Sequence, residues 1–254
     1  MKIENEHIEP MTFKRLMSQM IYQGKGVFLS SLLGNFLILG VLVTVLFLLF
    51  DYVALLGNDE EMMALLRTFN NALILSLGGV HIFYLLLCDR DMSTKQQMKT
   101  AMRKTLKVTP VLFIATFLFS ILATMGMAWL LIPGILIYTF FGLYSQTVAF
   151  ENQGILSSLL RSREIVRGSF WKVMGLLIGT LLVSNIITVG IEASLRFNMP
   201  VYPMWLDIGL YVFLYMLILP FLGSLYTFLY LDLRSRKEAF DHNVFLNERR
   251  KIFT

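Results

Sequence analysis

The polar side chains inside long apolar segments are the first candidates for chemistry in this sequence. Four of them stand out, namely Asn35, His81, Asn185 and Glu192. A polar group at membrane depth is costly to bury, so each is a functional candidate for a transport path or a proton site. The alternative is a packing role, because Asn and His hydrogen-bond between helices. Glu192 also precedes Arg196 at the i,i+4 spacing of an ion pair.

A membrane enzyme needs a cluster of titratable residues, and the sequence offers few of them. His7 and His242 lie in the terminal segments, which leaves His81 as the single intramembrane histidine, and Cys88 is the single cysteine. A zinc or di-metal site needs several such ligands, and no HExxH or His-rich motif occurs. We therefore expect no catalytic residues, no metal ion, no cofactor and no enzymatic activity.

A second group of charged residues follows the apolar segments on one side. Asp232 with Arg236, and Arg234 with Glu238, have i,i+4 spacing on a helix that continues out of the last apolar segment. Glu151 is expected to pair with a basic residue of the segment that follows it. The residues available to it are Arg161, Arg163 and Arg167. We hypothesise that these charged groups form a network at the cytoplasmic face, which holds the segment after Glu151 beneath the helices.

Long membrane-embedded helices must position these residues. Of the 254 residues, 56% are hydrophobic and 15% charged, against about 45–50% and about 25% in soluble domains. The excess lies in runs of about 20 apolar residues, which match the ~30 Å hydrocarbon core of a bilayer. We predict an all-α polytopic transmembrane bundle of six spans arranged as three hairpins, and we exclude a soluble enzyme. The expected spans are 27–50, 71–88, 108–127, 130–150, 173–195 and 207–231.

Glycine and proline residues predict where the spans turn and where they pack. The third and fourth spans form one apolar block too long to cross a bilayer once, and Gly126, Trp129 and the pair 133–134 mark the expected turn. Gly175 and Gly179 form a GxxxG motif in the fifth span. This spacing lets two helices approach closely, so we predict helix packing there, without identifying a partner.

Each expected hairpin follows a basic stretch with an apolar stripe, around residues 13–21, 95–107 and 155–170. We interpret these stretches as amphipathic cytoplasmic lead-in helices at the headgroup boundary. The alternative is that they are the ends of long helices. The expected organisation is an N-terminal cytoplasmic segment (1–26), a six-helix membrane domain (27–231) and a basic cytoplasmic C-terminal tail (232–254).

The distribution of basic residues predicts the orientation. In the six-span arrangement, 20 of the 22 Lys and Arg residues fall on one side, and only Arg67 and Arg196 fall on the other. By the positive-inside rule, both termini are cytoplasmic. The net charge of +5 is therefore interpreted as a topology signal. We expect a multi-pass protein of the cell membrane whose partners are anionic lipid headgroups, and no nucleic acid.

Two stretches resemble a known family. The first begins with Trp-Leu-Leu-Ile-Pro-Gly-Ile at 129–135 and continues through Phe150-Glu151 to Phe-Trp-Lys-Val at 170–173, and the second is 229–241. Together they resemble the bacterial membrane domain attached to some glycerophosphoryl diester phosphodiesterases, and its stand-alone relatives. The resemblance implies a helical bundle in the bacterial cytoplasmic membrane. It does not imply hydrolase activity, which belongs to a separate soluble barrel of about 250 residues, and we expect none here.

The sequence favours a non-catalytic membrane protein with an accessory, scaffold or envelope-maintenance role, compatible with a membrane-protein partner. The alternative is a transporter or permease component for a small molecule or lipid, in which Asn185, His81 and Glu192 line a path. Convergence of these side chains on one water-accessible cavity would favour transport. A membrane enzyme would need a cluster of reactive groups at the cytoplasmic face.

Overall fold

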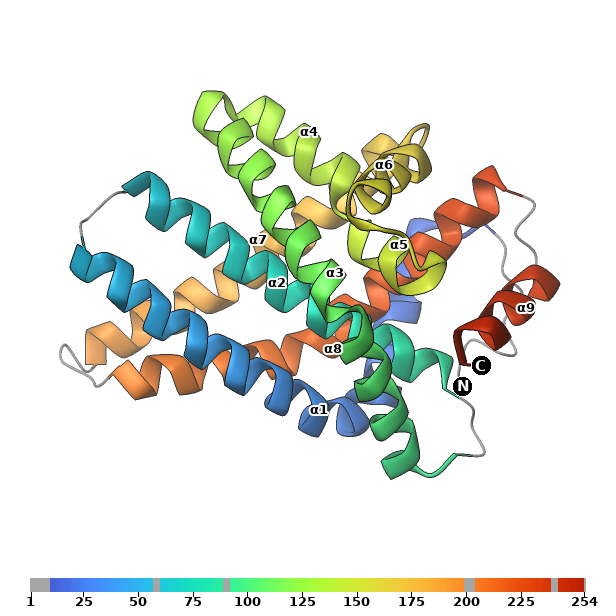
Figure 1. The fold of residues 1–254 in the computed structure, drawn as a ribbon, viewed down its shortest axis with the longest axis horizontal. Coiled ribbons are helices and arrows are strands. Elements are labelled where there is room, and N and C mark those ends of the chain that lie inside the picture. Colours follow the sequence, from blue (N-terminus) through green and yellow to red (C-terminus); the bar gives the residue numbers. More distant parts are fainter. Residues whose placement is uncertain (1–9, 57–59, 89–91, 199–203, 239–241, 254) are drawn as a thin grey trace.

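The described part of the chain is built from helices and contains no strand (Figure 1). The structure is a computed structural model, and it describes residues 10–56, 60–88, 92–198, 204–238 and 242–253. The predicted all-α class is thereby confirmed. The helices are α1 (Phe13–Leu56), α2 (Glu60–Leu87), α3 (Thr94–Trp129), α4 (Leu131–Phe141), α5 (Tyr144–Glu151), α6 (Ile155–Val166), α7 (Phe170–Asn198), α8 (Met204–Lys237) and α9 (His242–Phe253).

Several of these helices are long and apolar enough to cross a membrane. Within the described residues, four segments meet that requirement: Thr68–Leu87, Thr94–Trp129, Ile132–Glu151 and Val212–Lys237. A fifth candidate is α6 together with the first part of α7, between which the chain bends by 114°. A run of ~20 apolar residues spans the hydrocarbon core, so these lengths suggest association with a membrane.

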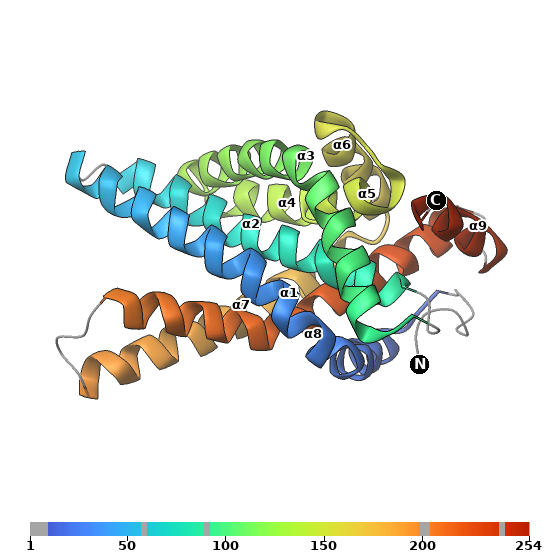
Figure 2. The ribbon, with the colours of Figure 1, turned by 60° about the horizontal axis from the view of Figure 1, so that its bottom comes forward.

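Helix α2 occupies the centre of the bundle. It packs against α1, α3 and α8, and α1 packs in turn against α8. Large α2 side chains such as Phe83 and Ile82 are fully buried. Figure 2 shows the α7–α8 pair diverging from the α1–α2 pair toward the end that lies away from α9. The two pairs therefore lie closer together toward the end that carries α5, α6 and α9.

The turn between α3 and α4 lies where the sequence predicts it. Helix α3 ends at Trp129, and Leu130 adopts an extended conformation before α4 begins. A Cβ added at Gly126 would lie 3.1 Å from the Cα of Gly134, so the two helices meet backbone to backbone. Pro133 is tolerated because it lies in the first turn of α4, where a backbone N–H has no partner within the helix.

The segment predicted as a single fourth span contains a break. Helix α4 ends at Phe141, and α5 begins at Tyr144. The hydroxyl of Ser162 in α6 occupies the break, accepting from the Leu143 N–H at 3.2 Å and donating to the Phe140 carbonyl at 2.9 Å. A side chain from a neighbouring helix thus bonds two backbone groups that α4 and α5 leave free.

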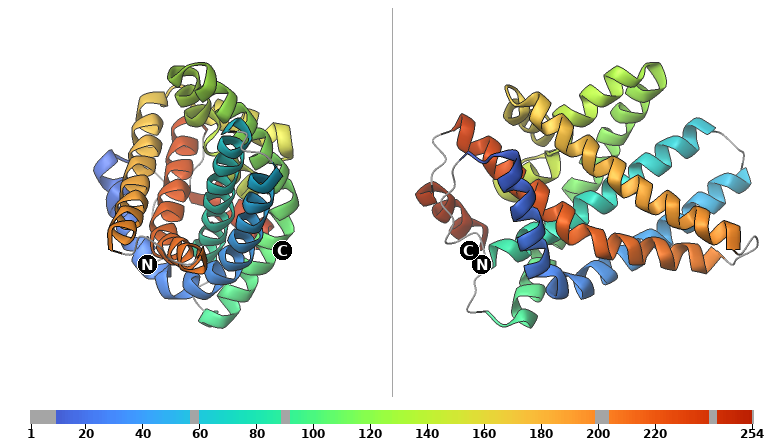
Figure 3. Two further views of the ribbon diagram at one scale, coloured as in Figure 1. Left: turned by 90° about the vertical axis from the view of Figure 1, so that its left-hand side faces the viewer. Right: turned by 180° about the vertical axis from the view of Figure 1, so that it is seen from behind.

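The lead-in prediction is wrong for the first two stretches and agrees with the structure for the third. Residues 13–21 and 95–107 are the first parts of α1 and α3, and the start of α1 lies at an angle to its remainder (Figure 3). At 36 residues α3 is about 54 Å long, so its basic part extends beyond a ~30 Å core. Helix α6 is separate because Gly168, with φ 99°, turns the chain before α7.

The predicted boundaries of the membrane domain do not coincide with breaks between helices. Helix α1 runs across the boundary at 26–27, and α8 runs across the boundary at 231–232. The residues assigned to a C-terminal tail include the end of α8 and all of α9. Both terminal segments are therefore parts of the folded bundle where the structure describes them.

Candidate functional site

The last two turns of α8 carry two sets of polar residues on two faces. Tyr230, Arg234 and Glu238 follow one another at i,i+4 spacing, so they share one face of the helix. Asp232 and Arg236 share another face by the same rule. The first face meets α5, α6 and α9, and the second meets α7 and the residues that precede α1. The end of α8 is therefore the point at which the charged contacts converge.

Arg161 of α6 links three carboxylates. Its Nε lies 2.8 Å from Glu151 at the end of α5, and its Nη1 lies 3.0 Å from Glu164 one turn along α6. Its Nη2 donates to Glu238 at the end of α8. Glu151 also accepts a hydrogen bond from the Tyr230 hydroxyl at 2.6 Å. One guanidinium thus joins three helices, as the planar fork of an arginine allows.

Arg234 forms the second centre of the same network. Its Nε lies 2.8 Å from Glu238 and 3.8 Å from Glu151, and its Nη1 lies 2.8 Å from Glu248 of α9. Its side chain is 7% exposed and lies over the Phe150 ring, with 5.4 Å between its Cζ and the ring centroid. The desolvated guanidinium is therefore stabilised by three carboxylates and an aromatic face.

Asp232 anchors the residues that precede α1. Its carboxylate is fully buried and accepts from Lys172 Nζ at 2.7 Å, from Arg236 Nε at 3.1 Å and from the backbone N–H of Met11. Lys172 and Arg236 also donate to the Met11 carbonyl, each at 2.7 Å. Both backbone groups of Met11 are therefore bonded by side chains from α7 and α8.

The ion pairs shift the titration of the exposed end of the network. Burial alone would raise the pKa of Glu238, but hydrogen bonds from Arg161 and Arg234 favour the carboxylate and hold its pKa below the ordinary value of 4.5. Glu238 is therefore charged at neutral pH, as its two arginine partners require.

Six of the eight residues predicted for the network form ion pairs, in two separate sets on two faces of α8. The ion pairs Asp232–Arg236 and Arg234–Glu238 are both present, and Arg161 is the residue that pairs with Glu151. Arg163 and Arg167 are exposed, and neither side chain forms an ion pair with another described residue. Arg163 is two positions from Arg161 on α6 and so lies on a different face, and Arg167 follows the end of that helix.

Sequence reasoning missed five members of this site, which are Met11, Glu164, Lys172, Tyr230 and Glu248. Tyr230 carried a signal, because it stands one helical turn before Arg234 and therefore shares its face. Glu248 and Met11 carried none. Their contacts depend on the return of α9 and of the α1 start to the end of α8, which is a tertiary arrangement.

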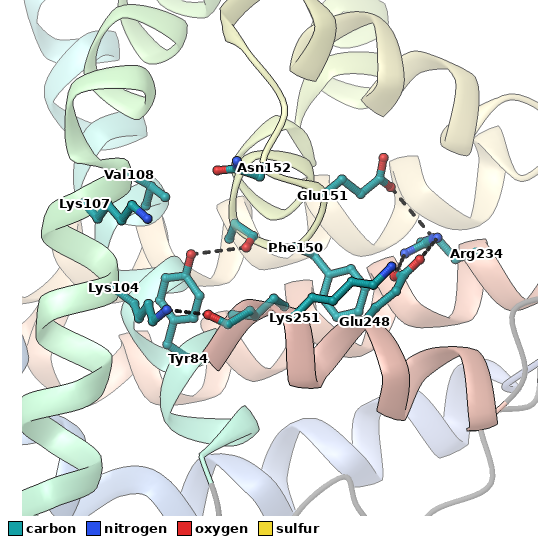
Figure 4. A pocket seen from close by; sticks show the side chains of 12 residues that line it. Tyr84, Lys104, Lys107, Val108, Phe150, Glu151, Asn152, Arg234, Glu248 and Lys251 are labelled. Atoms are coloured by element: carbon teal, nitrogen blue, oxygen red, sulfur yellow. Dashed lines mark hydrogen bonds and ion pairs between the residues drawn. The ribbon is translucent and has the colours of Figure 1, made fainter. Parts of the chain in front are cut away.

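A cavity of about 550 Å³ opens beside Arg234, between α2, α3, α5 and α9 (Figure 4). We call it the lysine cavity. Its charged lining consists of Lys104, Lys107, Glu151, Arg234, Glu248 and Lys251. Apolar and aromatic side chains complete its wall, including Val108 and Phe150. In Figure 4 the three lysine side chains come from two helices that face each other across the cavity.

The predicted intramembrane polar residues are described in part. Asn35 and His81 are fully buried, and their side-chain nitrogen and oxygen atoms have no hydrogen-bond partner among the described residues. The imidazole of His81 lies against Gly34, the neighbour of Asn35. Neither residue lines the lysine cavity. The side chains of Asn185 and Glu192 lie outside the part of the chain that the structure describes.

The close helix contact predicted at the GxxxG motif is not made within the described chain. A Cβ added at Gly175 or Gly179 would meet no heavy atom within 4 Å. The two glycines instead line an apolar groove of about 320 Å³ with Phe13, Met17 and Phe221. The groove lies between the start of α1, α7 and α8, so the space over the glycines is open within the described chain.

The described residues contain no set of side chains that could bind a metal ion. No group of three His, Cys, Asp or Glu side chains there has the geometry to hold a metal ion. The carboxylates that do gather at the end of α8 are bonded to arginine and lysine. Such an arrangement fixes helix ends relative to one another, and its arginines satisfy the carboxylates that a metal would need.

Comparison with known proteins gives one partial match. A domain of unknown function (DUF7847) matches residues 118–230, which run from the second half of α3 to Tyr230 of α8. The match includes Glu151 and Arg161 and ends before Asp232. No curated protein and no solved structure matches the chain. The match does not connect the chain with a phosphodiesterase, so the resemblance to the membrane domain of those enzymes stays a prediction.

Proposed function

We propose that this protein is a non-catalytic, multi-pass protein of the bacterial cytoplasmic membrane, with an accessory or scaffold role in the envelope. In this proposal six spans form three hairpins, and both termini face the cytoplasm. Support comes from the long apolar helices and from the placement of 20 of the 22 basic residues on one side of the six-span arrangement. The resemblance to a membrane domain that accompanies phosphodiesterases is in keeping with an accessory role.

The observation that carries the proposal is that the charged residues at the end of α8 bind one another. Arg161, Arg234 and Asp232 each bind two or more partners from other elements. A catalytic acid or base needs a free face toward a substrate, whereas these groups direct their atoms toward one another. The result is a rigid end of the bundle, which suits a surface that other membrane components dock against.

Charge exchange between Glu151 and Arg161 tests the structural role of the network. We expect Glu151→Arg and Arg161→Glu each to increase protease susceptibility of the protein in membranes, because each places like charges together. The double exchange should recover part of the resistance. Arg163→Glu, at an exposed position on the same helix, is the matched control and should leave the digestion pattern unchanged. Wild-type resistance in both single variants would exclude the network as the element that holds α6.

The transport alternative is favoured by one observation, the burial of Asn35 and His81 without hydrogen-bond partners in the described chain. Buried polar groups are normally paired, and a water-filled path would satisfy them. Asn35→Cys in a Cys88→Ala background separates the two functions. Reaction with a membrane-impermeant thiol reagent would show an aqueous path and favour transport. In a scaffold protein this cysteine should be unreactive. The control is Ser31→Cys, at a fully buried position one helical turn away, and the two cysteines should then react equally slowly.

A further inference from the structure

The lysine cavity carries an excess of positive charge. Four cationic side chains and two carboxylates line it, which sums to +2. Both carboxylates are bonded to arginine: Glu248 lies 2.8 Å from Arg234, and Glu151 lies 2.8 Å from Arg161. The negative charge at the wall is therefore directed into the network, and the lysines determine the sign of the field inside the cavity.

The cavity is built by tertiary packing and is more than a basic surface. Helix α9 forms one wall, and it is docked by Phe245, which is fully buried and stacks on Phe150 with ring centroids 6.1 Å apart. Arg249 of α9 donates to the Leu87 carbonyl at 2.7 Å, and Lys104 of α3 donates to the Ile252 carbonyl. In Figure 4, Lys104 and Lys107 lie on α3 at one side of the cavity, and the Lys251 side chain extends from α9 toward Arg234 and Glu248.

The size and chemistry of the cavity fit a small anionic group. Its volume of about 550 Å³ lies in the range of ~300–1,000 Å³ that is typical of ligand sites. Lysine is a flexible point-charge donor and a common phosphate binder, whereas a planar carboxylate is better matched by arginine. Lys104, Lys107 and Lys251 all line the cavity, and Lys104 also donates to the Ile252 carbonyl at its wall.

We propose that the lysine cavity binds a phosphate-bearing anion through Lys104, Lys107 and Lys251. The group is either the phosphate of an anionic phospholipid headgroup or that of a soluble phosphorylated molecule. Both sources have access, because Lys107 precedes the apolar part of α3 that starts at Val108, at the level expected for headgroups. The proposal goes beyond the scaffold function: Glu151, Arg234 and Glu248 of the network form part of the cavity wall, but the proposed ligand contacts are made by the lysines.

Binding by the full chain in nanodiscs tests this site in two arms. In the first arm, inorganic phosphate is titrated into protein held in phosphatidylcholine nanodiscs, at constant ionic strength with chloride as the competing anion. In the second arm, thermal stability is compared between nanodiscs of phosphatidylcholine alone and nanodiscs that also contain phosphatidylglycerol. The test variant replaces Lys104, Lys107 and Lys251 with Gln. The control variant replaces Lys14, Lys25 and Lys99 with Gln, three exposed lysines outside the cavity.

We expect the test variant to bind at least about tenfold more weakly than the control variant, which loses the same charge. A difference in the phosphate arm identifies a soluble ligand, and a difference confined to the phosphatidylglycerol arm identifies a headgroup. Equal behaviour of the two triple variants in both arms would overturn the proposal, because only general surface charge would then matter. Lys107→Gln alone, at an exposed position, provides the same comparison if the triple variant does not fold.

Discussion

At the scale of single residues, Arg234 is the member of the charged network that most depends on its partners, because its charge is buried. It is nearly inaccessible to solvent and contacts carboxylates from α5, α8 and α9. Removing one partner of a buried ion pair leaves the other charge buried without compensation, and this is usually more destabilising than the pair was stabilising. The loss of Arg234 would leave three carboxylates close together.

We therefore expect Arg234→Gln to lower the free energy of unfolding by about 3–5 kcal/mol. Thermal unfolding in detergent, followed by circular dichroism, measures the change. The exposed Arg163 provides the control, because Arg163→Gln should stay within ~0.5 kcal/mol of the wild type. Equal melting temperatures for the two variants would contradict the assignment of Arg234 as a buried centre.

The titration of Glu238 predicts a loss of stability in acid. Its pKa is below 4.5 in the folded protein, so the folded state binds the proton less readily than the unfolded state does. The stabilisation is fully present above about pH 4.5 and is lost as the pH falls through the folded-state pKa. Acid unfolding of the wild type and of Glu238→Gln should therefore differ, with the variant showing a flatter dependence below that pH. Parallel curves would show that Glu238 contributes nothing.

At the scale of helices, two glycines of α1 differ in their surroundings. A Cβ at Gly34 would overlap the imidazole of His81, with Cε1 at 2.8 Å, whereas a Cβ at Gly26 would meet nothing within 4 Å. His81 is fully buried and has little freedom to move aside. Gly34 is thus required for the contact between α1 and α2, and Gly26 is not.

Replacement of each glycine by alanine separates these roles. We expect Gly34→Ala to destabilise the protein by about 1–3 kcal/mol through overpacking. Gly26→Ala should stabilise it by about 0.5–1 kcal/mol, because alanine is the better helix former. Chemical denaturation of the purified variants gives both values. A stabilising Gly34→Ala would show that the two helices do not meet at this residue.

The helices also show which features were predictable from sequence. The α3–α4 turn was predictable, because glycine and proline residues signal turns locally. The break between α4 and α5 was not, because the hydroxyl that stabilises it belongs to Ser162, about twenty residues further along the chain. The lead-in stretches before α1 and α3 were misjudged for a related reason. A charged amphipathic stretch has the same sequence pattern whether it forms a separate helix or the end of a long one.

At the scale of the whole molecule, the contacts across α8 explain why the candidate site was only half predictable. The pairs at i,i+4 spacing depend on helix geometry alone, so Asp232–Arg236 and Arg234–Glu238 followed from the sequence. Glu248 approaches Arg234 because α9 folds back onto Phe150. Likewise, the glycines at 175 and 179 line a groove because of how α1 and α8 lie, which no local pattern encodes.

The predicted orientation, with both termini on the cytoplasmic side, can be tested on the whole molecule. In a Cys88→Ala background, Arg163→Cys should react with an impermeant thiol reagent only from the cytoplasmic side. Asn58→Cys, which follows the first expected span, should react only from the opposite side. Labelling of inverted and right-side-out vesicles distinguishes them. Reaction of both cysteines from one side would exclude the six-span arrangement.

The bonding of Met11 has a consequence for the order in which the protein is assembled. The backbone of Met11 is held by Asp232, a residue 221 positions further along the chain. A ribosome must therefore synthesise the chain through Asp232 before the Met11 N–H has its partner, although Lys172, which bonds the Met11 carbonyl, is made earlier. The Asp232 contact therefore forms only after α8 has been made, and α9 docks later still. A chain interrupted before Asp232 would contain α1 to α7, including Lys172, and still lack the carboxylate that bonds the Met11 N–H.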